Sequence, residues 1–71
     1  MSSKNYYKIL ATNVKIERIR NGLSQMELAE KAGVSIDVVG KIERATANPA
    51  LEKVISIALA LNVDLNTLLP L

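Results

Sequence analysis

The chain has 71 residues, 49% of them hydrophobic and nearly all of those aliphatic, with a formal net charge of +2. It contains no Cys and no His, which excludes a disulfide framework, a thiolate zinc site and a catalytic triad that needs an imidazole base. A chain this short has little room for a substrate pocket, and no apolar run reaches the roughly 20 residues of a membrane span. We therefore expect one non-enzymatic domain with no metal, no cofactor, no small-molecule ligand and no membrane partner.

The first seven residues contain neither the apolar core nor the small-residue cleavage pattern of a secretory signal, so we expect a cytoplasmic protein. Residues 1–8 are predicted to form a partly ordered N-terminal arm, and residues 9–71 to form the domain. The first helix begins after Asn5 or after Thr12, because both side chains can cap a helix N-terminus. It ends near Gly22, since Gly tolerates the left-handed conformation of a helix C-terminus.

The second helix has the clearest start signal in the chain. Ser24-Gln25-Met26-Glu27 is a capping box, in which Ser caps the helix and Glu three residues later bonds back to it. Gly33 ends this helix after about nine residues. Ser35 then caps a third helix that runs to about Arg44.

The rest of the chain predicts two more helices. The first of these spans residues 50–61 and has too many apolar residues for one narrow stripe, and Asn62 can end it. The last is short, starts at Asp64 and ends before Pro70. Because the apolar spacings are three and four rather than two, there is no strand signal, and the sequence predicts an all-α fold.

The two short helices joined through Ala32-Gly33-Val34-Ser35 form a helix-turn-helix. Val39 and Ile42 are three residues apart and should face inward, which leaves the other side of the third helix exposed. The first turn of such a helix can enter a major groove about 12 Å wide. This pairing points to duplex DNA as the partner.

Several linked segments resemble the Xre or Cro/repressor family of helix-turn-helix regulators. They are Gly22–Ser35, Val39 with Lys41-Ile-Glu-Arg44, Asn48-Pro-Ala-Leu51, and Ile57–Val63 with the leucines that follow. The resemblance covers residues from about 10 to 69. It implies a compact five-helix bundle of the lambda-repressor-like type and a sequence-specific transcriptional regulator of the repressor, Cro-like or controller kind. It also implies a homodimer on a palindromic double-stranded operator.

The resemblance implies a set of DNA-contacting residues on the second and third helices and the loop that follows. Gln25 would bond a phosphate at the start of the second helix. Ile36 or Val38 can contact a thymine methyl group, and Lys41 can donate to guanine. Gly40 would leave space for the DNA backbone. The full set is Gln25, Ser35, Ile36, Asp37, Val38, Lys41, Arg44, Thr46 and Asn48.

Some members of this set have a second interpretation. Asp37 can accept a hydrogen bond from cytosine N4 or merely stabilise the helix N-terminus. Arg44 and Thr46 are candidate phosphate ligands, although Arg44 can equally be a solvated surface charge. Asn48 is expected first to anchor its loop and second to bind phosphate. The family resemblance also implies a partly buried structural ion pair between Arg18 and Glu43.

The apolar surplus near the C-terminus is expected to form a self-complementary dimer contact. Its predicted residues are Leu65, Leu68, Leu69 and Leu71. The alternative is that these leucines merely cover a small core.

The third helix departs from the family pattern, which commonly has Arg, Gln, Ser or Thr where Ile36, Asp37 and Val38 stand. This departure leaves a second function open, a protein-interaction module such as an antitoxin-like or antirepressor-like subunit with weak or no specific DNA binding. Salt dependence separates the two, because specific DNA binding weakens steeply as salt rises.

Overall fold

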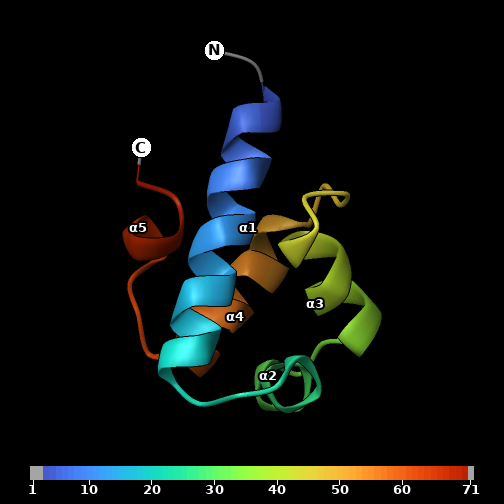
Figure 1. The fold of residues 1–71 in the computed structure, drawn as a ribbon, viewed down its shortest axis with the longest axis vertical. Helices are drawn as coiled ribbons and strands as arrows, with labels where there is room; N and C mark the ends of the chain where they lie inside the picture. The colour runs from blue at the N-terminus through green and yellow to red at the C-terminus, as the bar shows by residue number, and fades with distance from the viewer. Residues whose placement is uncertain (1–2, 71) are drawn as a thin grey trace.

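The computed structural model describes residues 3–70, with side chains from Tyr6 onward, and this part of the chain forms five helices (Figure 1). They are α1 (Ser3–Arg20), α2 (Gln25–Ala32), α3 (Ile36–Glu43), α4 (Leu51–Leu61) and α5 (Leu65–Leu68). The predicted all-α bundle is confirmed. None of the described helices is long and apolar enough to cross a membrane.

The start of α1 differs from the prediction. The helix begins at Ser3, so residues 3–8, expected in an arm, are its first turns, and neither Asn5 nor Thr12 marks its start. Tertiary contacts extend the helix, since Leu10 and Ala11 are buried and the Tyr7 hydroxyl donates a hydrogen bond to Asn48 Oδ1 at 2.9 Å. Residues 1 and 2 of the predicted arm lie outside the described residues.

The predicted ends of α2 are confirmed. Ser24 Oγ accepts from the Glu27 backbone N–H at 3.0 Å, and Glu27 Oε1 accepts from the Ser24 N–H at 2.8 Å. Gly33 closes the helix in the left-handed conformation (φ 71°), where a residue with a Cβ would be strained. The capping box and this glycine fix the length of α2 at eight residues.

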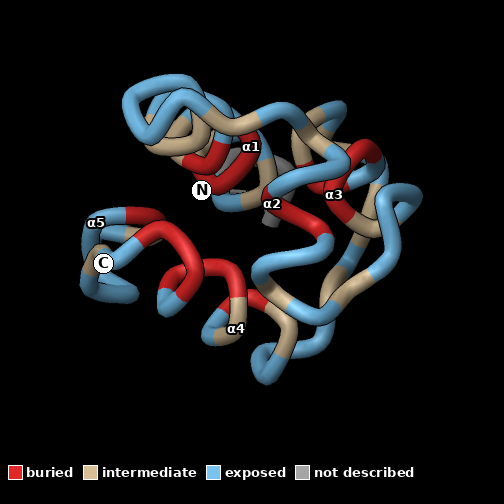
Figure 2. The backbone as a smooth tube through the Cα atoms, turned by 90° about the horizontal axis from the view of Figure 1, so that it is seen from below, coloured by how far each residue is buried: buried red, intermediate tan, exposed pale blue. Residues whose placement is uncertain are grey.

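The core lies between α1, α2, α3 and α4, and α5 closes it from the C-terminal side (Figure 2). Its fully buried side chains come from every one of these helices. The largest of them are Leu28, Ile42, Ile57, Leu61, Leu68, Val14 and Val39.

The position of Leu68 differs from the prediction that it lies at a dimer contact. Its side chain is 0% exposed and belongs to the core, and its carbonyl accepts a hydrogen bond from Asn13 Nδ2 at 3.0 Å. Leu69 is half-buried against the core, whereas Leu65 is 36% exposed. Helix α5 has only four residues, and the side that packs on α1 contains Leu68, whereas Leu65 faces solvent. Leu71 lies outside the described residues.

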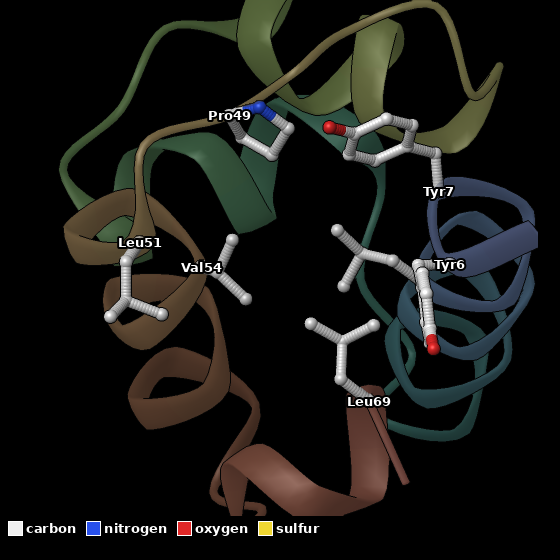
Figure 3. Close-up of a pocket in the computed structure, with 7 residues that line it drawn as sticks. Tyr6, Tyr7, Pro49, Leu51, Val54 and Leu69 are labelled. Carbon is white, nitrogen blue, oxygen red and sulfur yellow. The ribbon is translucent and has the colours of Figure 1, made fainter. Parts of the chain in front are cut away.

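An apolar cavity of about 150 Å³ remains between α1 and the start of α4 (Figure 3). Tyr6, Tyr7 and Leu10 line it from α1. The opposite wall and the base are formed by Pro49, Leu51, Val54 and Leu69. The Tyr7 ring therefore belongs to this wall while its hydroxyl bonds Asn48, which ties the first turns of α1 to the loop between α3 and α4.

Candidate nucleic-acid interface

The turn between α2 and α3 fixes the direction in which α3 leaves the bundle. The backbone N–H of Gly33 bonds the carbonyl of Glu30, and the N–H of Val34 bonds that of Ala29 at 3.0 Å. Val34 packs against the core. Ser35 Oγ then accepts from the Val38 N–H at 3.2 Å and caps α3, as the sequence predicted.

Helix α3 has one buried side and one exposed side. Val39 and Ile42 are 0% and 2% exposed, as expected from their spacing. Val38, expected to project outward, is instead half-buried and packs against the core beside them. The buried stripe of α3 is therefore one residue wider than predicted, and the exposed side is correspondingly narrower.

The exposed side of α3 carries Ile36, Asp37, Lys41 and, at the helix end, Arg44. Lys41 Nζ lies 3.1 Å from Asp37 Oδ2, one helical turn away. The two side chains are 52% and 66% exposed, so the pair lies in solvent on the surface predicted to meet DNA. Figure 1 places this helix at the edge of the molecule, between α2 and the loop that leads to α4.

Gly40 was predicted to leave space for the DNA backbone, but the Arg44 side chain covers it. A Cβ placed on Gly40 would lie 2.9 Å from Arg44 Nη1, so the missing side chain makes room for the guanidinium. Gly40 is consequently buried although it is on the outward side of the helix. Arg44 is thereby laid back along α3 by local contact.

The loop after α3 holds two more predicted residues. Thr46 Oγ1 donates to the Lys41 carbonyl at 3.3 Å, and its backbone N–H bonds the same carbonyl at 3.0 Å. Asn48 accepts from Tyr7, so it anchors its loop as the first of its two interpretations stated. The sequence did not identify Tyr7 as the residue that positions Asn48, because a contact between positions 7 and 48 has no local signal.

Arg18, Glu43 and Gln25 form one hydrogen-bonded network that joins α1, α3 and α2. Arg18 Nε and Nη2 donate to the two carboxylate oxygens of Glu43 at 2.7 and 3.0 Å, with side chains 13% and 4% exposed. Gln25 Nε2 donates to Glu43 Oε1 at 3.2 Å. The bond to Glu43 raises the pKa of Arg18, against the opposing effect of burial. The structure therefore contains the predicted ion pair, and it adds Gln25 to it.

The comparisons with known proteins agree with this geometry. A family model described as helix-turn-helix matches residues 14–68. The chain belongs to the helix-turn-helix family. The resemblance to Xre and Cro-type regulators is therefore confirmed, and a DNA-binding regulator of the Cro or controller type is the function that this family membership supports.

Two curated relatives have regulatory names. The control protein C.SmaI of Serratia marcescens is 42% identical over 62 residues, which are 87% of this chain and 74% of that protein. The HTH-type transcriptional regulator SutR of Escherichia coli K12 is 38% identical over 64 residues, 90% of this chain. The chain spans only 36% of the length of the second relative.

Solved structures show the same fold. The hypothetical transcription factor NHTF from Neisseria superposes with a TM-score of 0.89 at 33% identity, covering 97% of this chain and 79% of that one. The restriction-modification controller protein C.AhdI from Aeromonas hydrophila gives 0.84 at 29% identity, covering 87% and 94%. The five-helix arrangement thus recurs in relatives of similar length.

Proposed function

We propose that the chain is a sequence-specific double-stranded DNA-binding transcriptional regulator that inserts α3 into the major groove. The observation that carries this proposal is the division of α3, whose buried side locks it into the core while Ile36, Lys41 and Arg44 stand exposed. A helix presented in this way from a helix-turn-helix can contact base edges along its outer side. The proposal includes a cytoplasmic location and no catalytic role.

The contacts divide into base contacts and phosphate contacts. Lys41 donates to guanine O6 or N7, and Ile36 packs on a thymine methyl group. Arg44 and the Ser35 hydroxyl lie beside them as candidate phosphate ligands, and Thr46 joins them when its hydroxyl hydrogen turns from the Lys41 carbonyl to a phosphate oxygen.

Gln25 and Asn48 can serve both the protein and the DNA. An amide NH₂ has two hydrogens, so Gln25 keeps one for a phosphate oxygen while the other bonds Glu43. Asn48 accepts from Tyr7 through Oδ1, which leaves its Nδ2 as a donor. The network that orients Gln25 is the one that joins α1 to α3, so α2 and α3 would approach the backbone as one unit.

We propose further that two copies bind a palindromic operator and meet through α4. Leu51, Ile55 and Leu59 are 61%, 41% and 75% exposed and are spaced four residues apart. Residues at this spacing lie on one side of a helix. The row is symmetric about Ile55, so two antiparallel α4 helices related by a two-fold axis would set Leu51 of each copy against Leu59 of the other. Of the leucines predicted at first, Leu65 remains a candidate at this contact.

Sedimentation equilibrium tests the dimer. Leu59→Glu is expected to give a monomer at concentrations where the wild-type chain is dimeric, because it places two carboxylates in an apolar contact. Ile19→Glu is the matched control, since Ile19 is 60% exposed on α1 and lies outside the α4 row. Equal effects of the two variants, or a wild-type monomer at all concentrations, would refute this contact.

Selection of duplexes from a random pool, followed by salt titration on the selected sequence, tests DNA recognition. Lys41→Ala is expected to relax selection at one base position, whereas Gln25→Ala weakens all duplexes alike. Arg20→Ala removes the same charge from an exposed side chain two residues beyond Arg18 on α1, and is the control. A wild-type chain that binds no duplex at low salt would instead favour the protein-interaction module.

A further inference from the structure

The Asp37–Lys41 pair has only a small structural role in the folded chain. Both side chains are more than half exposed. Within the part of the chain that the structure describes, the Asp37 and Lys41 side chains make their polar contact with each other. A solvent-exposed pair of this kind contributes little to folding. The capping bond of α3 is already provided by Ser35, so Asp37 adds only the weak attraction of a carboxylate to the helix N-terminus.

The position of Asp37 is unfavourable for general DNA affinity. It is the acidic side chain on the exposed side of α3, because Glu43, the other acidic residue of the helix, is 4% exposed and bonded to Arg18. A carboxylate there repels phosphate, and it also occupies the ammonium group of Lys41. An ammonium group has three N–H donors, so Lys41 can still donate to a base or a phosphate, but the bond to Asp37 takes one of them and restricts where Lys41 Nζ can reach.

We infer that Asp37 is a specificity-determining residue that penalises every duplex except one that presents an amino group opposite it. This inference rests on the proposed DNA-binding function of α3. Cytosine N4 and adenine N6 both present amino groups in the major groove, but the acceptor N7 beside adenine N6 repels a carboxylate, so cytosine N4 is the preferred partner. When cytosine N4 donates a hydrogen bond to the Asp37 carboxylate, the attraction of Asp37 for Lys41 weakens, and Lys41 Nζ can reach a neighbouring guanine O6 or N7. On other sequences Asp37 stays paired with Lys41 and gains no donor from the DNA, and the repulsion between its carboxylate and the phosphates weakens binding.

Asp37→Asn tests the inference, because it preserves size and removes the charge. Binding is measured for the wild-type chain and the variant on two duplexes of equal length, one selected by the wild-type chain and one of unrelated sequence. We expect the variant to bind the unrelated duplex more tightly than the wild-type chain does. The preference for the selected duplex over the unrelated one should fall about tenfold, which is within the range for the loss of one good base contact. A repeated selection with the variant should lose the preference for cytosine at one position.

Asp64→Asn is the matched control. Asp64 is exposed, precedes α5 and makes no side-chain capping bond. Helix α5 lies on the other side of α1 from α3 (Figure 1). If both variants raise affinity for the two duplexes by the same factor, the effect is one of net charge and the inference is wrong. It is also wrong if Asp37→Asn changes neither affinity while the wild-type chain binds its selected duplex. If the wild-type chain binds no duplex, the proposed DNA-binding function is wrong, and the role inferred for Asp37 is wrong as well.

Discussion

The two halves of the molecule are held together in different ways. In the half formed by α2 and α3, serine side chains cap both helices, and the Arg18–Glu43–Gln25 network ties them to α1. In the half formed by α4 and α5, neither N-cap residue makes a side-chain capping bond. Side-chain caps and a buried ion pair therefore orient α3, the helix proposed to contact DNA. The other half is held mainly by apolar burial, with side-chain bonds from Asn13 to the Leu68 carbonyl and from Asn21 to the Leu61 carbonyl, and it leaves an exposed aliphatic row beside a cavity.

The strongest test of this contrast removes the carboxylate at the centre of the network. Glu43→Ala leaves Arg18 partly buried without its partner and should lower the free energy of unfolding by about 3–5 kcal/mol. Urea unfolding followed by circular dichroism measures it. The control is Lys41→Ala, which breaks the Lys41–Asp37 pair, exposed on both sides, and should cost at most about 1 kcal/mol. Similar losses for both variants would mean that the network does not hold the half together.

In the other half, burial should decide the cost of a truncation. Leu68→Ala deletes a fully buried side chain and is expected to cost about 2–5 kcal/mol. Leu65→Ala, three residues earlier in the same helix and 36% exposed, should change stability by about 0.5 kcal/mol or less. Urea unfolding at a protein concentration below self-association compares them. A larger loss for Leu65→Ala than for Leu68→Ala would contradict the burial of Leu68.

Two glycines sharpen the comparison within the half formed by α2 and α3, because substitution by Ala should change the stability with opposite signs at the two positions. Gly33→Ala forces a side chain into the left-handed conformation and is expected to destabilise by about 1–2 kcal/mol. Gly40→Ala raises helix propensity by up to about 1 kcal/mol and pushes aside only the mobile end of Arg44. Thermal unfolding reports both changes. Weaker binding of Gly40→Ala to unrelated duplexes would show that the position of Arg44 matters for phosphate contact.

The smallest expected effect is a pH dependence from the capping box. The bonds from Ser24, its backbone N–H first, hold the pKa of Glu27 below its ordinary value of 4.5. The stabilisation is therefore complete above pH 4.5 and is lost as the pH falls through the lowered pKa. Urea unfolding between pH 7 and pH 3 should show a shallower loss for Glu27→Gln than for the wild-type chain. Glu30→Gln, on the same helix but outside the capping box, controls for loss of one carboxylate.

The sequence predicted the features that depend on neighbouring residues. The capping box at Ser24, the left-handed stop at Gly33 and the inward stripe of Val39 and Ile42 are set within one or two helical turns, and each was found as expected. The Arg18–Glu43 pair spans 25 positions and was reached only through the family resemblance.

Features that depend on distant contacts could not be predicted in this way. The early start of α1 was missed although Ser2, of a residue type that caps helices, precedes it in the sequence, because support for these first turns comes from packing and from the bond from Tyr7 to Asn48. Leu68 is buried in a core built from distant helices, and its carbonyl accepts a hydrogen bond from Asn13, 55 positions away. Val38 and Gly40 were misplaced because the width of the buried stripe and the course of the Arg44 side chain follow from tertiary packing.

The four-residue spacing of Leu51, Ile55 and Leu59 has a consequence for how such a protein responds to its own abundance. Under the proposed pairing, two chains must meet before both halves of an operator are filled. While most chains are single, the amount of paired protein then grows with the square of the total concentration. A twofold rise in synthesis would bring close to a fourfold rise in operator-competent protein, so three exposed aliphatic side chains would give a small regulator a threshold.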